Sequence, residues 1–100
     1  MRKHSAFILP SAKKDIYEVR KWYSQYNNEL PKRFKEELEH IVEALKLKPA
    51  IHAIRYRNIR FAQLRKFPYA IHYFIDETSS TINIIAVCHT AINPATWRTP

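Results

Sequence analysis

The period of the apolar residues changes at Pro49, and this change constrains the fold more than any other feature of the chain. Before Pro49 the apolar residues recur every three or four positions, which is typical of one face of a helix. After Pro49 they alternate with other residues or form continuous runs, which is typical of strands. The sequence therefore predicts an α+β fold.

A short strand and a first helix are expected before residue 27. Residues 5–9 form an apolar run that ends at Pro10, and Ser11 is placed to cap the helix that follows. This helix extends to about Tyr26, because apolar residues mark one helical face: Ile16, Val19, Tyr23 and Tyr26. Asn27-Asn28 is expected to end it, since asparagine tolerates the left-handed backbone found just past helix ends.

A second helix is expected between Leu30-Pro31 and Pro49. Proline suits the first helical position because its missing N–H has no intrahelical partner there. The apolar stripe of this helix is Phe34, Leu38, Ile41, Val42 and Leu45. The short connection to the first helix predicts an antiparallel helical hairpin.

Three strands are expected after Pro49, at about 59–64, 69–75 and 82–88. Phe67-Pro68 predicts a tight turn, and the polar segment 76–81 predicts a hairpin loop. Leu64 breaks the alternation begun by Ile59 and Phe61. This slip indicates either a bulge or twist near Gln63 or a strand that is apolar on both faces.

The predicted order is β-α-α-β-β-β: one domain over residues 1–100, with a helical hairpin packed on a small, mostly antiparallel four-stranded sheet. The chain contains no glycine. Every turn must therefore be made with Pro, Asn, Asp or Ser, and both glycine-rich types of phosphate-binding loop are excluded.

The positive charge is concentrated in one segment. The formal net charge is +8, and residues 44–75 carry seven Lys or Arg side chains with no Asp or Glu. Such a segment attracts phosphate backbones or an acidic protein segment; the alternative interpretation is ordinary solubility charge. We predict that the target-binding basic patch is Arg55, Arg57, Arg60, Arg65 and Lys66.

Several classes of site are not expected. Cys88 is the only cysteine, so no intrachain disulfide can form, and its apolar surroundings favour a buried core thiol. The spacing of the histidines does not predict a metal site, and we expect no cofactor and no small-molecule substrate. No apolar run has the roughly 20 residues that a membrane span needs. With no recognisable signal peptide, a cytoplasmic location is expected.

Two local patterns resemble the RelE/ParE toxins of type II toxin–antitoxin systems. The first is similar to the family's third-strand pattern and reads Phe67-Pro68-Tyr69-Ala70-Ile71-His72-Tyr73. The second is similar to the family's ending and reads Ala86-Val87-Cys88-His89-Thr90-Ala91-Ile92-Asn93-Pro94-Ala95-Thr96-Trp97. The order of elements and the start of the second helix also fit, so the resemblance covers nearly the whole chain.

The resemblance implies a toxin that a cognate antitoxin neutralises by wrapping around it. ParE-like members bind and poison DNA gyrase, whereas RelE-like members cut mRNA in the ribosomal A site. The chain departs from the family pattern at Ile92, where an arginine is usual, and in the loop after Pro49, which lacks the usual glycine. The first departure weakens any function that needs that arginine.

A ribonuclease of this kind needs a general base, a general acid and cations around the scissile phosphate. The candidate cations are Arg57, Arg60 and Arg65, and the candidate proton carriers are His89 and Tyr69. The alternatives are that His89 anchors a turn and that Tyr69 packs half-buried in the sheet. The segment 97–100 offers neither the Tyr nor the His that RelE-like nucleases place near the C-terminus.

Three hypotheses follow. The favoured one is a ParE-like toxin that acts by binding DNA gyrase and is not an enzyme. The alternative is a RelE-like ribosome-dependent mRNA endonuclease. The third is a non-toxic, basic nucleic-acid-binding domain outside the family, whose second predicted strand follows phosphates.

Overall fold

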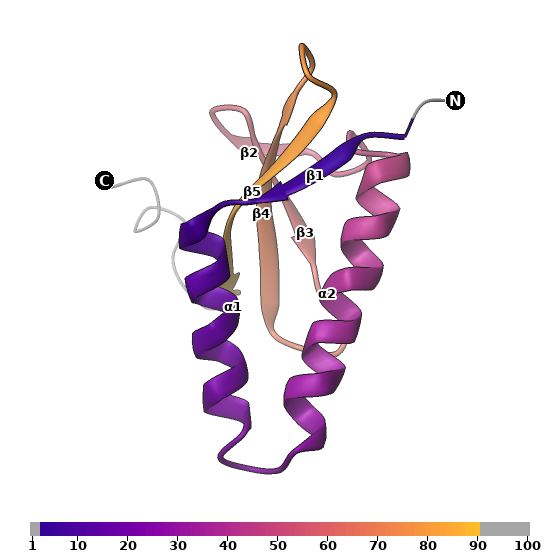
Figure 1. Ribbon diagram of the computed structural model, residues 1–100. Coiled ribbons are helices and arrows are strands. Elements are labelled where there is room, and N and C mark those ends of the chain that lie inside the picture. The colour runs from indigo at the N-terminus through magenta and orange to yellow at the C-terminus, as the bar shows by residue number, and fades with distance from the viewer. Residues whose placement is uncertain (1–2, 91–100) are drawn as a thin grey trace.

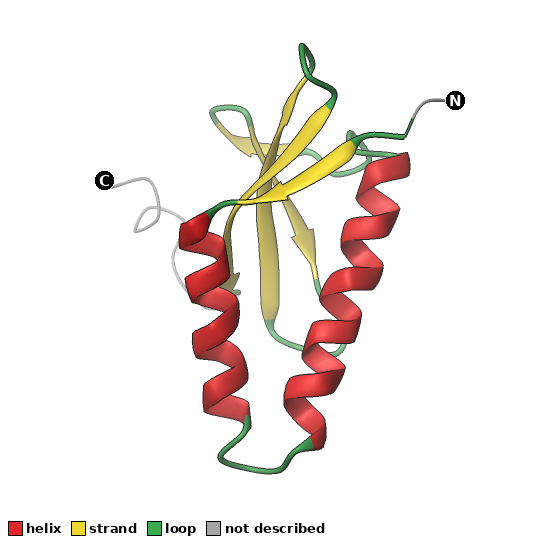
Figure 2. Ribbon diagram, in the orientation of Figure 1, coloured by secondary structure: helices red, strands yellow, loops and turns green. Residues whose placement is uncertain are grey.

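The computed structural model describes residues 3–90 of the chain and confirms the α+β fold. Two helices lie in front of a twisted sheet, as Figures 1 and 2 show. The elements are β1 (Ser5–Ile8), α1 (Pro10–Tyr23), α2 (Glu29–Leu47), β2 (Ile54–Tyr56), β3 (Ile59–Gln63), β4 (Tyr69–Asp76) and β5 (Thr81–His89). The strand order is β1-β5-β4-β3-β2; β1 is parallel to β5 and the other pairs are antiparallel.

Within residues 3–90 the sheet has five strands where the sequence predicted four, because β2 was missed. This strand has three residues, and Ile54 at its start is 52% exposed. It pairs with β3 through a register shift between Ile54 and Tyr56. A strand of three residues is too short to show an alternating pattern in the sequence. Its pairing with β3, and not its own residue pattern, orders it.

The first helix begins earlier and ends earlier than predicted. Pro10 occupies its first turn, and the Ser11 hydroxyl donates to the Ile85 carbonyl of β5 at 2.7 Å instead of capping the helix. Proline sets the helical φ angle by itself, so the serine is available for the sheet. Nearby, the Asp15 carboxylate accepts the backbone N–H of Val87 at 3.0 Å. These contacts hold α1 along β5, beyond the point where β1 stops.

Asn27 acts on the second helix instead of closing the first. Its Oδ1 atom accepts the backbone N–H groups of Glu29 and Leu30, both at 2.9 Å. These are donors of the first turn, which have no carbonyl partner inside a helix. The helix therefore starts at Glu29, and Pro31 lies in its first turn instead of at its first position. The predicted end before Pro49 is confirmed.

The slip in the apolar pattern of β3 reflects a strand that is buried on both faces. Its pairing with β4 is regular from Arg60 to Gln63, so there is no bulge at Gln63 in this ladder. Ile59 and Ala62 are both buried although they lie on opposite faces. The register shifts lie elsewhere, between Ile54 and Tyr56 and between His72 and Tyr73.

The main core lies between the helices and the front of the sheet. The predicted helical stripes supply part of it, and β4 and β5 supply the floor through Ile71, Tyr73, Ile82 and Ile84. Phe34 and Phe67 meet edge to face, with ring centroids 5.3 Å apart. Within residues 3–90, neither helix is both long and apolar enough to cross a membrane.

Candidate functional site

The predicted basic patch divides into two separate groups. Arg55 and Arg57 belong to the β2–β3 hairpin, whereas Arg65 and Lys66 lie in the turn between β3 and β4. Because a strand rises about 3.3 Å per residue, β3 holds these two turns roughly 20 Å apart. A run of cations that is continuous in sequence is therefore not one continuous surface.

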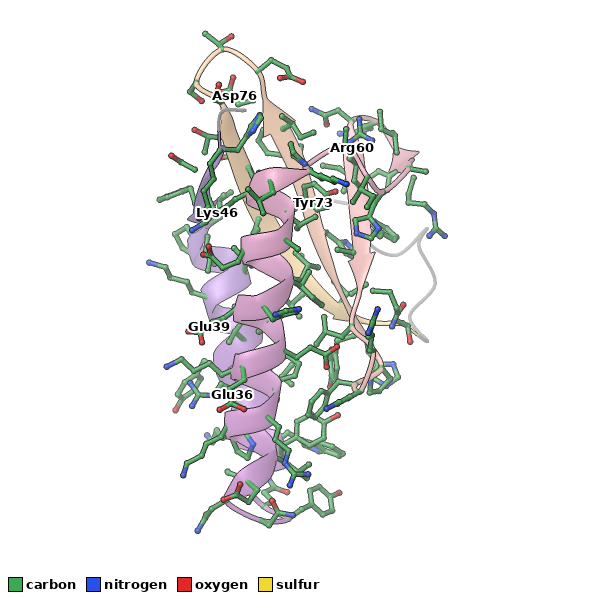
Figure 3. All side chains as sticks on the ribbon, turned by 90° about the vertical axis from the view of Figure 1, so that its right-hand side faces the viewer. Glu36, Glu39, Lys46, Arg60, Tyr73 and Asp76 are labelled. Carbon is green, nitrogen blue, oxygen red and sulfur yellow. The ribbon has the colours of Figure 1, made fainter. Side chains whose placement is uncertain are left out.

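Arg60, between these groups, is engaged inside the protein. Its Nη1 atom donates to the His52 carbonyl at 2.6 Å and to the Ala50 carbonyl at 3.4 Å. Across the strand pair, the buried Tyr73 hydroxyl donates to the Pro49 carbonyl at 2.6 Å. Figure 3 labels both side chains at the same end of the sheet. Together they fix the connection between α2 and β2, so we assign Arg60 a structural role.

Arg55 takes part in a stack on the back of the sheet. Its guanidinium carbon lies 4.9 Å from the centre of the Phe61 ring, and Phe61 stacks on His72 with centroids 3.9 Å apart and planes 11° apart. Burial, with a further contribution from the Arg55 charge, lowers the pKa of His72 to about 4. His72 is therefore uncharged at neutral pH. The sequence analysis did not predict this stack.

Tyr69 and His89 are the two nuclease candidates that the structure brings together. They pair across β4 and β5, with ring centroids 5.1 Å apart. Tyr69 also packs against Tyr23 of α1 and Phe34 of α2. Burial raises the pKa of Tyr69. The phenolate form of Tyr69, which is the form that could act as a base, is therefore scarce near neutral pH.

The other nuclease candidates do not complete that pair. Arg60 lies opposite Tyr73, four residues along β4 from Tyr69, which is roughly 13 Å. Arg65 is closer than Arg60 to Tyr69 in the chain, but an acidic side chain contacts the backbone of Arg65. The Glu37 carboxylate accepts the backbone N–H groups of Arg65 and Lys66. This contact brings an acid from α2 to a segment that contains none in sequence.

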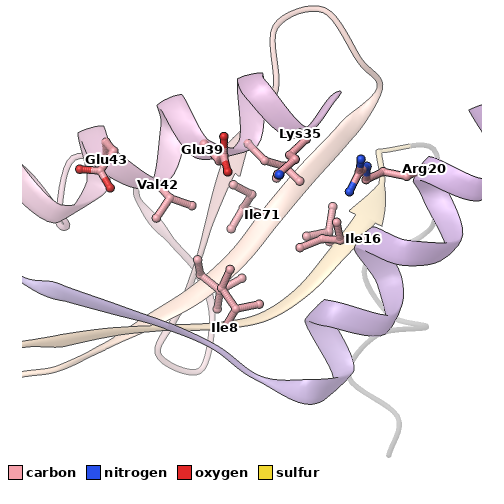
Figure 4. A pocket seen from close by; sticks show the side chains of 11 residues that line it. Ile8, Ile16, Arg20, Lys35, Glu39, Val42, Glu43 and Ile71 are labelled. Atoms are coloured by element: carbon pink, nitrogen blue, oxygen red, sulfur yellow. The ribbon is translucent and has the colours of Figure 1, made fainter. Parts of the chain in front are cut away.

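An apolar groove between α1 and α2 is a feature that the sequence analysis did not predict. It encloses a cavity of about 230 Å³, shown in Figure 4. Its floor includes Ile71 of β4 and Ile84 and Val87 of β5, and its walls include Ile16 of α1 and Val42 of α2. Each of these residues looks like ordinary core in the sequence. The cavity depends on how the two helices, which diverge from the loop that joins them (Figure 1), pack on the sheet.

The rim of the groove carries both signs of charge. Arg20 of α1 and Lys35, Glu39 and Glu43 of α2 line it. Glu43 contacts Lys46 at 2.7 Å and Lys3 at 3.2 Å, and these contacts lower the pKa of its carboxyl group.

Cys88 lies outside the groove and is partly exposed. Burial raises the pKa of its thiol to about 11, so the thiolate is scarce at neutral pH.

A model of the family described as the ParE toxin of the type II toxin–antitoxin system, parDE, matches residues 7–94. The chain belongs to this family. The match includes Asn93-Pro94 and the departure at Ile92, which lie outside the residues that the structure describes, as does Trp97. No curated protein sequence matches the chain.

Two solved structures share the fold of this ParE-family chain. One is from the chromosomal ParDE toxin–antitoxin system of P. aeruginosa, with a TM-score of 0.74 and 13% identity over 87% of this chain and 96% of the other. The second is from the toxin–antitoxin complex RelBE2 of Mycobacterium tuberculosis, with a TM-score of 0.66 and 18% identity over 92% and 97%. The predicted RelE/ParE-like architecture is thereby confirmed.

Proposed function

We propose that this ParE-family toxin acts on DNA gyrase by binding and that it cuts no RNA. The dispersal of the nuclease candidates carries this proposal. Arg60 is bonded to the carbonyls of Ala50 and His52, and Tyr69 contacts His89 at a place about 13 Å along β4 from the residue that Arg60 faces. A phosphoryl-transfer site needs these groups around one phosphate. The gyrase target itself comes from the resemblance to ParE-like toxins.

The experiment compares the two activities in one culture and with purified components. Induction of the toxin is expected to reduce plasmid supercoiling and to produce double-strand breaks while transcripts stay intact. Purified toxin is expected to inhibit supercoiling by gyrase. Transcripts cut at codon positions without DNA damage would overturn the gyrase proposal.

The RelE-like alternative rests on the contact between Tyr69 and His89. Tyr69→Phe together with His89→Ala removes both candidate proton carriers. If the toxin is a ribosome-dependent nuclease, this variant loses transcript cleavage and toxicity while remaining folded. Unchanged toxicity of the folded variant removes the alternative. The third hypothesis, a domain outside the family, does not fit the match to ParE over residues 7–94.

We further propose that a cognate antitoxin neutralises the toxin by placing apolar side chains in the groove between α1 and α2. The two structural relatives come from a ParDE toxin–antitoxin system and a RelBE2 complex. A cavity of about 230 Å³ with an apolar floor suits large side chains of an amphipathic helix, because an apolar cavity of about 150 Å³ already holds benzene.

Val42→Asp tests this contact because it places a carboxylate in the groove wall. Ala44→Asp is the matched control, since Ala44 is an exposed residue of the same helix and does not line the groove. The antitoxin encoded beside the toxin gene is expected to bind the wild type and the control but not Val42→Asp. Equal binding to all three would place the antitoxin elsewhere.

A further inference from the structure

Two cations line the same end of the groove. Arg20 extends from α1 and Lys35 from α2, and Figure 4 labels both side chains at this end of the pocket. Within residues 3–90, the side-chain ion pairs are Lys3–Glu43 and Lys46–Glu43, so Arg20 and Lys35 take part in none. Glu39 lies on the same rim but forms no ion pair with either.

Arg20 also has a donor without an acceptor. Its Nε atom is buried and makes no hydrogen bond to any residue that the structure describes. A buried donor left in this state is unfavourable, because it has lost water and gained nothing in return. An acceptor supplied from outside the chain, at the end of the groove, would remove this penalty.

We propose that the cognate antitoxin places one carboxylate between Arg20 and Lys35, beside the apolar residues that fill the groove, and that this contact selects the antitoxin. The inference rests on the proposed antitoxin contact and adds its recognition chemistry. A carboxylate has two acceptor oxygens, which suits the fork of an arginine and leaves room for a lysine. The apolar floor strengthens the attraction by excluding water.

The groove favours an acidic protein side chain over a nucleic-acid phosphate. The cations border a cavity whose floor is Ile71, Ile84 and Val87, so an occupant must bring apolar groups as well as a negative charge. A phosphate backbone brings the charge alone. An antitoxin with a neutral or basic residue at this point would leave both cations unpaired and desolvated, which is how the contact discriminates.

The test measures the affinity of the purified antitoxin, encoded beside the toxin gene, by isothermal titration calorimetry. Lys35→Glu is the main variant, because its side chain is exposed and the fold does not depend on it. Lys32→Glu is the matched control, on the same helix, exposed and away from the groove. We expect Lys35→Glu to weaken binding by at least about tenfold relative to Lys32→Glu.

A charge exchange then identifies the partner group. Each Asp and Glu of the antitoxin segment is replaced by Lys, and one replacement is expected to restore binding to Lys35→Glu while weakening binding to the wild type. Arg20→Lys, which keeps the charge but loses the fork, is expected to weaken binding less than Arg20→Glu. Thermal melting of each variant confirms that it is folded.

The outcomes separate the inference from the proposal beneath it. If Lys35→Glu and Lys32→Glu bind equally well while Val42→Asp fails to bind, the antitoxin occupies the groove but the carboxylate contact is wrong. If no antitoxin replacement restores binding, the inference is also wrong. If Val42→Asp binds like the wild type, the groove contact itself fails and the inference falls with it.

Discussion

Replacing Arg60 with Ala removes the hydrogen bonds that hold the connection between α2 and β2. The bond from Nη1 to the His52 carbonyl is 2.6 Å long and has a charged donor, and the bond to the Ala50 carbonyl is 3.4 Å long. A hydrogen bond from a charged group contributes about 1.5–3 kcal/mol to stability. The longer bond adds little, because hydrogen bonds weaken steeply with length.

We therefore expect Arg60→Ala to lower the free energy of unfolding by about 2–3 kcal/mol. For a domain of this size, such a loss lowers the melting temperature by roughly 10–20 °C. The assay is urea denaturation followed by circular dichroism, with thermal melting as a second measurement. Arg65→Ala is the matched control. Its side chain is exposed and forms no bond within residues 3–90, so its effect stays within about 0.5 kcal/mol.

Equal stability of Arg60→Ala and Arg65→Ala would rule out the structural role of Arg60. That result would mean that the carbonyls of residues 50–52 are satisfied by water without loss. Arg60 would then again be available as a target-binding cation. A stable Arg60→Ala variant that lost toxicity would point to the same conclusion.

Other substitutions test local contacts. Glu37→Ala releases two backbone N–H groups of the β3–β4 turn and is expected to cost about 1–2 kcal/mol in urea denaturation, while its exposed neighbour Glu36→Ala costs under about 0.5 kcal/mol; equal losses would contradict the contact. Arg57 has a φ of 50°, a backbone conformation that favours glycine. Arg57→Gly is therefore expected to raise the free energy of unfolding by up to about 1 kcal/mol. A clear decrease in the free energy of unfolding would show that the turn is unstrained. Burial raises the pKa of Asp15 more than its hydrogen bond from Val87 lowers it. The folded state therefore holds the proton more tightly, and stability falls as pH rises from 3.8 through the folded-state pKa. Asp15→Asn keeps the acceptor and removes this dependence on pH. Denaturation at a series of pH values is therefore expected to show that the stability of the variant, relative to the wild type, increases as pH rises. An increase in relative stability toward acid pH would contradict the raised pKa.

The helices were predictable from sequence because their periodicity reports burial directly. Val19, Phe34, Leu38 and Leu45 are buried at the spacing that defined the stripes. The helix ends were less predictable, because a short polar side chain has several acceptors within reach. The Ser11 hydroxyl bonds to β5, which is 74 residues away in the chain. No local pattern shows that such an acceptor is near.

The site was less predictable than the fold. The segment 44–75 showed where the cations are in the chain but not how β3 would separate them or that Glu37 would join them. The groove was invisible because a cavity is a property of how elements pack. Arg20 and Lys35 lie on different helices and are far apart in sequence from the sheet residues beneath them. Only their arrangement in space suggests that they act together.

The roles of the cations follow from what surrounds each of them. The hairpin that displays Arg55 and Arg57 contains β2, a strand of three residues that is too short to be stable alone. The preceding connection is held by Arg60 and Tyr73 through the carbonyls of residues 49–52. Arg60 therefore supports the hairpin that carries Arg55 and Arg57, while its own guanidinium is bonded to backbone carbonyls. If Arg60→Ala abolished toxicity and also lowered the melting temperature, Arg60 would be a support of this hairpin; loss of toxicity at an unchanged melting temperature would instead indicate a lost target contact.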